Sequence, residues 1–267
     1  MRLGVVSTSY PRRPGDWAGG FVGEHVAWLR AAGHAVDVIA AGPGDDAALR
    51  VAAAPGLFYD GGAPEALAAR ARWGDAARFG AALTAAVARR GRVWDAAIAH
   101  WIAPCALAAA AARPRRPLLA IAHSGDVHLL VRTGLAAPAA ALLAAAGARV
   151  VFVSEALRER FADALPRWLR GRYAQAPVCS MGVDVLRLRA AFGGDTLTTN
   201  GIGNPYVLFL GRLVPIKGID TLIDAAPRWG GRAATVIAGD GPERGRLQAR
   251  APALRFTGEV GGARRDA

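Results

Sequence analysis

The stretch YVLFLGRLVPIKGIDTLIDAA, residues 206–226, shows the repeating unit that decides the fold of this protein. Its first five residues, 206–210, are all apolar and are typical of a buried strand. The turn 211–218 begins and ends with glycine, and after it Ile219, Leu222 and Ile223 recur at helical spacing. A buried strand that leads through a glycine turn into a helix predicts one unit of a parallel α/β sheet.

The same alternation of short apolar runs and longer helical stretches extends over the chain. One predicted helix is outlined by Val22, Val26 and Leu29 and closed by Gly33, and another begins after Ser154 as its N-cap. The predicted fold class is α/β, with Rossmann-like, doubly wound parallel sheets. The predicted strands cover residues 3–6, 36–40, 96–99, 118–122, 150–153, 177–179, 206–210, 235–238 and 254–257.

A break in this alternation divides the chain into two predicted domains. Residues 193–204, GGDTLTTNGIGN, are rich in glycine, threonine and asparagine and are predicted to be a linker. Residues 1–192 then form an N-terminal, Rossmann-like domain. Residues 205–267 supply only the first half of a second doubly wound domain, so we expect this domain to be incomplete, with an open sheet edge at its last strand.

Composition and charge argue against a disordered chain, a nucleic-acid-binding protein and a protein stabilised by disulfides or zinc. The 267 residues are 53% hydrophobic and 20% charged, which predicts a folded globular chain. The net charge is +12, but every basic residue except Lys217 is an arginine and the arginines are scattered, which favours a small anionic ligand and no nucleic-acid partner. Cys105 and Cys179 have neither disulfide nor metal-ligand spacing and are expected to be buried thiols.

The sequence also predicts a cytoplasmic location. The start of the chain turns polar too early for a signal peptide, and no run reaches the roughly 18 to 20 apolar residues of a membrane span. The segment 165–173 mixes arginines with Trp168 and aliphatic side chains, as membrane-surface segments do. Peripheral association with the inner face of a membrane therefore remains open, with an ordinary solvated face as the alternative.

Two strand-to-helix turns are candidates for phosphate binding, because open parallel sheets bind ligands beyond the carboxyl ends of their strands. Gly19 and Gly20 precede a helix whose N-terminal amides attract phosphate, although a plain flexible turn explains them equally well. Arg212 and Lys217 lie near the two ends of the turn 211–218 and are candidates for clamping a diphosphate. A solvated pair of cations is the alternative. The single lysine of an arginine-rich chain favours the functional interpretation.

A third turn, residues 239–242 with the sequence GDGP, follows a predicted strand and precedes a helix predicted to begin at Pro242. With Gly245 it forms GxGxxxG, and Glu259 lies about twenty residues further on, as in the dinucleotide-binding fingerprint. An NAD(P)-dependent oxidoreductase is therefore one alternative function.

His123 directly follows a predicted strand, with Asp126 close behind it, and so occupies the position where a polar side chain meets a ligand in this fold. A structural histidine is an equally good interpretation. For three other histidines the structural interpretation is favoured: His25, His100 and His128.

Several of these segments together resemble glycosyltransferase family 4, from its first strand to about the middle of its second domain. The resemblance implies a C-terminally truncated chain with the two-domain GT-B fold, in which residues 1–192 are the acceptor-side domain and residues 205–267 are the first half of the nucleotide-sugar-binding domain. It also implies metal-independent, retaining transfer of a hexosyl-type sugar, without a cofactor, from a nucleotide-diphosphate sugar to a glycan or lipid-linked acceptor in cell-envelope polysaccharide biosynthesis. The segments that carry it are AAGHAVDVIA, AHSGDVHLL, VFVSEALRERF, SMGVD, LFLGRLVPIKGIDTLIDAA, VIAGDGPERGRLQARA and LRFTGEV.

The resemblance assigns roles to individual residues by position. His123 would be catalytic, next to the reacting carbon of the donor sugar. Arg212 and Lys217 would hold the diphosphate, with the Gly19 and Gly20 turn against the phosphates from the other domain. The residues that would approach the nucleoside are Gly239, Asp240, Gly241, Gly258, Glu259 and Val260.

One feature of the family pattern is missing from the sequence. The acidic EX7E motif would follow the last residue, and none of the six glutamates pairs at that spacing. The chain is therefore expected to be inactive by itself. A non-catalytic sugar-nucleotide-binding protein is the second alternative function.

Overall fold

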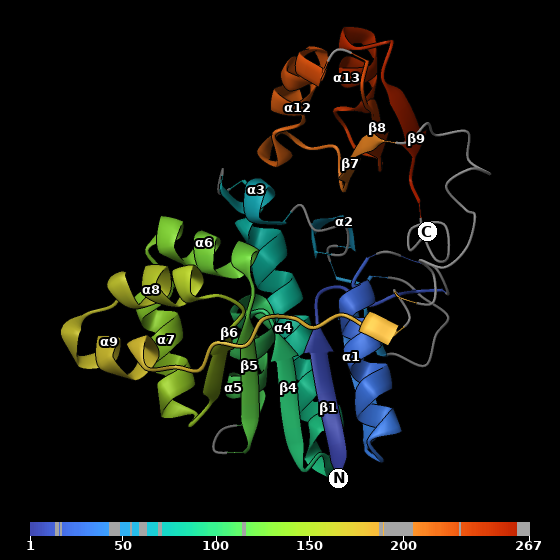
Figure 1. Ribbon diagram of the computed structural model, residues 1–267. Coiled ribbons are helices and arrows are strands. Elements are labelled where there is room, and N and C mark those ends of the chain that lie inside the picture. The colour runs from blue at the N-terminus through green and yellow to red at the C-terminus, as the bar shows by residue number, and fades with distance from the viewer. Residues whose placement is uncertain are drawn as a thin grey trace. The chain divides into compact units, whose positions relative to one another are not determined.

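The computed structural model describes residues 1–13, 16, 18–42, 49–53, 55–58, 63–68, 71–113, 116–186, 189, 205–229 and 231–260. The chain divides into two compact units, Met1–Gly182 and Val183–Ala267, each built on its own parallel sheet (Figure 1). The linker predicted at residues 193–204 lies outside the described residues. The predicted fold class, α/β with two Rossmann-like parallel sheets, is confirmed.

The sheet of the first unit has the strand order β3-β2-β1-β4-β5-β6, and all of its described pairings are parallel. The order reverses between β1 and β4, which lie side by side (Figure 1). In open α/β sheets the crevice at such a reversal is where ligands bind. The strands are β1 (Arg2–Ser7), β2 (Ala35–Ala41), β3 (Leu49–Val51), β4 (Ala96–His100), β5 (Leu118–Ala122) and β6 (Arg149–Phe152).

Helices cover both faces of this sheet. Successive strand residues point to opposite faces, so Val5 packs in the core under α1 (Gly20–Ala31), whereas Val6 packs in the core under α4 (Trp73–Arg90). The other helices are α2 (Pro55–Phe58), α3 (Ala63–Ala68), α5 (Leu107–Ala112), α6 (Ser124–Thr133), α7 (Ala136–Ala145), α8 (Glu155–Asp163) and α9 (Arg167–Ala174), with the short turns η1 (Gly91–Val93) and η2 (Ile102–Ala106).

The structure confirms the helix ends predicted at Gly33 and Ser154. Gly33 has a φ of 85° just past α1, and the next residue, His34, donates its N–H to Leu29 O at 3.1 Å. This closure of a helix by a left-handed glycine needs no side chain. At the start of α8, Ser154 Oγ accepts a hydrogen bond from Leu157 N at 3.4 Å.

The segment 177–179 is not the strand that its sequence predicts. Only Val178 pairs, in an isolated bridge with Phe152, after which the chain leaves the sheet. As a result Cys179 is exposed, and the prediction of a buried thiol there is wrong, whereas Cys105 is buried as predicted. The three-residue strand β3 was not predicted, because Arg50 lies at its centre and interrupts the apolar run.

The second unit has the strand order β7 (Tyr206–Leu210), β8 (Ala234–Ala238), β9 (Arg255–Gly258). Its small core consists of Leu213, Ile219, Ile223, Ile237 and Leu247. The helix predicted from Pro242 begins only at Arg244, because Glu243 N donates to Leu213 O at 3.2 Å and the chain still turns there. The remaining elements are η3 (Pro215–Lys217), α12 (Ile219–Ala225), η4 (Ala226–Trp229) and α13 (Arg244–Arg250).

Candidate functional site

Histidine and aromatic side chains gather at the carboxyl ends of β4 and β5 in the first unit. His100 is the last residue of β4, Trp101 follows it, and His123 comes directly after β5. Because β4 borders the reversal in strand order, these residues lie where this fold binds ligands.

The Gly19–Gly20 turn lies beside His123. Gly19 has a φ of 72°, and a Cβ there would come 2.4 Å from the Ser9 backbone, so only glycine fits. A Cβ on Gly20 would meet no atom within 4 Å, which leaves the space at the start of α1 open. The next residue, Phe21, places its ring centroid 5.2 Å from that of His123. The fold therefore brings the predicted phosphate turn next to the predicted catalytic histidine.

Two more histidines are linked to His123 in series, His100 directly and His25 through His100. His100 Nδ1 lies 3.2 Å from His123 Nε2, and His100 Nε2 lies 3.0 Å from His25 Nδ1 on α1. Burial lowers the pKa of His100 to about 2 and the pKa of His123 to about 4, so both rings are neutral at neutral pH. The sequence favours separate structural roles for His25 and His100, whereas the structure joins them to His123. His128 is exposed on α6, outside this group.

Asp126, in the first turn of α6, is a site residue to which the sequence analysis gave no role. Its side chain is buried, and Oδ2 accepts a hydrogen bond from Ile102 N at 2.5 Å. Burial raises the pKa of this carboxyl to about 7. The bond ties α6 to the turn after β4 and so fixes the spacing between His100 and His123.

The backbone of Trp101 is strained. Its φ of 72° is uncommon for any residue with a side chain, and rarer still for a bulky one. Its N–H nevertheless donates to Ile121 O at 2.9 Å and continues the pairing of β4 with β5. The Trp101 ring centroid lies 4.9 Å from that of His123, so the strained residue forms one wall of the histidine group.

Three glycine turns interlock at the carboxyl end of the sheet in the second unit. Gly211 N donates to Ala238 O at 3.0 Å, and Gly239 N donates to Gly258 O at 2.7 Å. A Cβ on Gly239 would lie 1.8 Å from Gly211 O, and one on Gly241 would lie 2.4 Å from Leu213 O. These close approaches explain the glycines and bring the predicted nucleotide contacts to one end of this sheet.

The predicted cations of the second unit lie at the same end. Lys217 is exposed in η3 and, among the described residues, makes no ion pair, whereas Arg212 is half-buried. Asp240 accepts from Gly241 N at 2.7 Å and from the Arg244 guanidinium at 2.6 Å, and both bonds lower the pKa of its carboxyl. Arg244 is thus a further cation at this end, to which the sequence analysis gave no role. Glu259 is exposed and Val260 half-buried, directly after Gly258.

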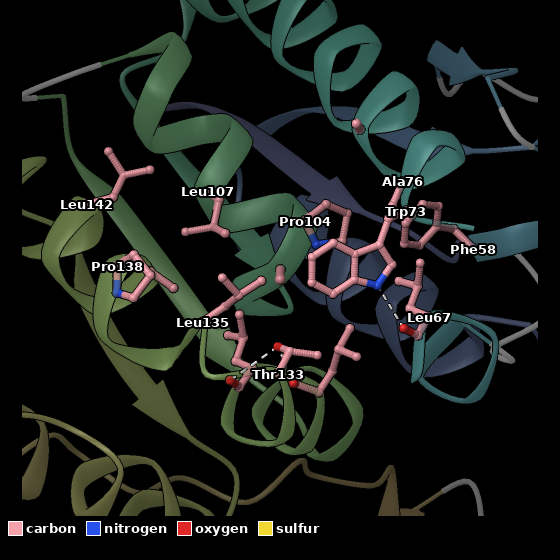
Figure 2. Close-up of a pocket in the computed structure, with 15 residues that line it drawn as sticks. Phe58, Leu67, Trp73, Ala76, Pro104, Leu107, Thr133, Leu135, Pro138 and Leu142 are labelled. Carbon is pink, nitrogen blue, oxygen red and sulfur yellow. Dashed lines mark hydrogen bonds between the residues drawn. The ribbon is translucent and has the colours of Figure 1, made fainter. Parts of the chain in front are cut away.

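The first unit also holds an apolar cavity of about 430 Å³ between α3, α4, α6 and α7 (Figure 2). Two polar groups on its wall bond to backbone: Trp73 Nε1 donates to Leu67 O at 2.8 Å, and Thr133 Oγ1 donates to Leu129 O at 2.7 Å. Side chains of Leu107, Leu135 and Leu142 also line the cavity. The cavity therefore suits a hydrocarbon group and has the size of a ligand pocket.

Over the described ranges, no three His, Cys, Asp or Glu side chains are grouped to hold a metal ion. No single described helix is long and apolar enough to cross a membrane, and α6 and α7 pass that test of length and composition only as a pair, bent by 116°.

Two parallel α/β sheets on one chain, each with functional groups beyond the carboxyl ends of its strands, define the architecture of the GT-B glycosyltransferases. The chain belongs to Glycosyltransferase Family 4, whose sequence profile matches residues 18–169. The profile described as "Glycosyl transferases group 1" matches residues 204–266.

One known protein is similar to this chain in sequence, and solved structures are similar to it in fold. A GDP-mannose-dependent alpha-mannosyltransferase of Mycobacterium tuberculosis is 40% identical over 92 residues, which span 34% of this chain and 21% of the mannosyltransferase. HepE of Anabaena, solved in complex with UDP-glucose, has a TM-score of 0.60 at 18% identity, over 97% of this chain and 69% of HepE. An α,α-trehalose 6-phosphate synthase from Burkholderia multivorans has a TM-score of 0.62 at 15% identity, over 99% of this chain and 73% of that protein.

Proposed function

We propose that this protein is a hexosyl-type glycosyltransferase that moves a sugar from a nucleotide-diphosphate sugar to an acceptor, with retention of configuration and without a metal or other cofactor. Its membership of Glycosyltransferase Family 4 is the observation that carries the proposal. Further support comes from the relatives, since one is a GDP-mannose-dependent enzyme and another was solved with UDP-glucose.

The proposed mechanism is electrostatic. As the bond between sugar and diphosphate breaks, negative charge grows on the leaving phosphate, and Arg212 and Lys217 would stabilise it without a metal ion. Gly19 and Gly20 would contact the phosphates, and His123 would contact the donor sugar. The nucleoside would lie against Gly239, Asp240, Gly241 and the segment 258–260.

The two alternative functions are less favoured. An oxidoreductase would need the GxGxxxG pattern for a dinucleotide, but Gly245 lies inside α13 and a Cβ there would meet no atom within 4 Å, so this position does not require glycine. A non-catalytic sugar-nucleotide-binding protein would share the binding residues, and only turnover distinguishes it from an enzyme.

Lys217→Ala is expected to weaken binding of a nucleotide-diphosphate sugar by about 10- to 150-fold, or about 1.5 to 3 kcal/mol, because a charge-assisted bond to the diphosphate is lost. Binding of the free nucleoside should change little. Calorimetry with GDP-mannose, UDP-glucose, guanosine and uridine measures both effects. Binding is the chosen readout because no glutamates of the chain have the EX7E spacing.

Arg228→Ala is the matched control for this experiment, since it removes one exposed positive charge from the same unit, in η4. Its affinities should equal those of the wild type. Equal losses in the Lys217 and Arg228 variants would mean that only net charge matters, and the assignment of Lys217 to the diphosphate would be rejected.

We further propose a lipid-linked acceptor rather than a free glycan, and a cytoplasmic location at the inner face of a membrane. The apolar cavity supports the acceptor, because a hydrocarbon group gains by leaving water and needs no hydrogen bonds. Helix α9 supports the location. Leu169 and Tyr173 face the core, whereas Trp168 is 74% exposed next to the exposed Arg167 and Arg170.

Trp168→Ala is expected to reduce binding to anionic vesicles several-fold, because an amphipathic ring beside arginines favours the membrane interface. Co-sedimentation with phosphatidylglycerol vesicles at low salt measures it, and high salt should release the wild type. Trp28→Ala is the matched control, since Trp28 is 66% exposed on α1. Absence of wild-type binding at low salt would reject the membrane proposal.

A further inference from the structure

His25, His100 and His123 form a continuous hydrogen-bonded chain from α1 to the start of α6. The two nitrogen–nitrogen distances are 3.0 Å between His25 and His100 and 3.2 Å between His100 and His123. His100 is fully buried in the middle and uses both of its ring nitrogens. The protons of the three rings are therefore coupled.

The coupling follows from the charge of the central ring. Burial, with the neighbouring histidines, lowers the pKa of His100 to about 2, so His100 carries a single N–H proton. A neutral imidazole donates from one nitrogen and accepts at the other. His100 therefore donates to His123 and accepts from His25, or it does the reverse. It cannot donate to both.

These two arrangements give His123 opposite properties toward a ligand. If His100 donates to His123 Nε2, the proton of His123 is on Nδ1, which then acts as a donor. In the reverse arrangement the proton of His123 is on Nε2 and is donated to His100 Nδ1. The Nδ1 atom of His123 is then unprotonated and can only accept a hydrogen bond. Among the described residues, His123 Nδ1 has no hydrogen-bond partner, and the His123 side chain does not cap α6.

We propose that His25 and His100 are positioning residues that hold His123 with its proton on Nδ1, so that this ring donates a hydrogen bond to a ligand oxygen. The ten-residue helix α6 begins directly after His123, and the positive end of a helix attracts oxygens that accept hydrogen bonds. The rings of Phe21 and Trp101 lie against His123 and restrict its rotation. The predicted tautomer of His123 does not depend on the proposed function. The predicted effect of this tautomer on turnover does rest on the proposed function.

Nitrogen-15 NMR of the full chain with labelled histidine tests the proposal, since protonated and bare ring nitrogens have different shifts. The wild type should show His123 with its proton on Nδ1 alone. His25→Phe removes the outer donor and should give a mixture of tautomers. His25→Asn restores an amide N–H where Nδ1 was and should restore the single tautomer. His128→Phe, which removes a histidine outside the chain, should leave the wild-type pattern unchanged.

The rate of sugar transfer provides the second readout and is measured on a form of the protein that is active. His25→Phe should lower kcat by about two- to tenfold, in proportion to the lost tautomer, with the donor KM nearly unchanged, and His25→Asn should recover it. A wild-type His123 protonated on Nε2, or the same tautomer in wild type and His25→Phe, overturns the proposal. A tautomer shift without loss of kcat upholds the positioning role and instead overturns the proposed catalytic role of His123.

Discussion

Asparagine in place of Asp126 is expected to remove about 4 kcal/mol of pH dependence from the free energy of unfolding between about pH 4 and pH 8. Burial raises the pKa of Asp126 to about 7 in the folded protein, from an ordinary value of 3.8. As the pH rises, the unfolded chain therefore releases this proton first. The stability linked to the neutral carboxyl is fully present below about pH 4 and is lost as the pH rises to about 7.

Chemical unfolding of wild type and Asp126→Asn at about pH 4, 6 and 8 measures this difference. The two proteins must be compared with each other, because buried histidines with lowered pKa values change stability with pH in the opposite direction in both. Asparagine keeps an oxygen that can accept from Ile102 N, but it buries an unpaired amide and can lower stability at every pH. The decisive quantity is therefore the change of the free energy of unfolding with pH, and not its absolute value. Parallel slopes would show that Asp126 is ionised in the folded protein.

Gly239→Ala is expected to destabilise the second unit by roughly 3 kcal/mol or more and to abolish the nucleotide binding proposed for it. Its Cβ would lie 1.8 Å from Gly211 O, and a φ of 137° is a backbone conformation that residues with side chains rarely adopt. Because the obstacle is backbone, it can be relieved only by separating the two turns.

Hydrogen exchange of β8, together with calorimetry on nucleotide sugars, measures this prediction. Gly245→Ala is the matched control from the same GxGxxxG pattern. Gly245 lies in α13 with no atom within 4 Å of its added Cβ, so alanine should be neutral or stabilise the helix by about 0.5 to 1 kcal/mol. Wild-type exchange and binding in Gly239→Ala would show that the turns are not held as close as the structure has them.

The sheet could be predicted from the sequence wherever a buried strand forms one uninterrupted apolar run. Strand β5 (Leu118–Ala122) was predicted with its observed ends for this reason. The segment 177–179 was misjudged because its residues resemble a strand, while only Val178 finds a partner. The start of α13 was misplaced because proline suits a first helical turn, and the sequence does not reveal that Glu243 N is already bonded to Leu213 O.

The site could be predicted only in part. His123 stands out because it directly follows a strand, and the glycine turns stand out by composition. His25 and His100 are separated by 75 residues, and each alone resembles a core histidine, so their contact depends on how α1 packs against the sheet. Asp126 resembles an ordinary acid in a first helical turn, and only its burial distinguishes it.

The strained backbone of Trp101 has a consequence for how the candidate site would bind a ligand. A φ of 72° at such a residue persists only because the bond from Trp101 N to Ile121 O and the surrounding packing enforce it. The conformation of the wall beside His123 is therefore fixed by the sheet when the protein folds, before any ligand binds. Little conformational entropy is left to be lost there on binding, so ordering of this wall adds little to the free-energy cost of association.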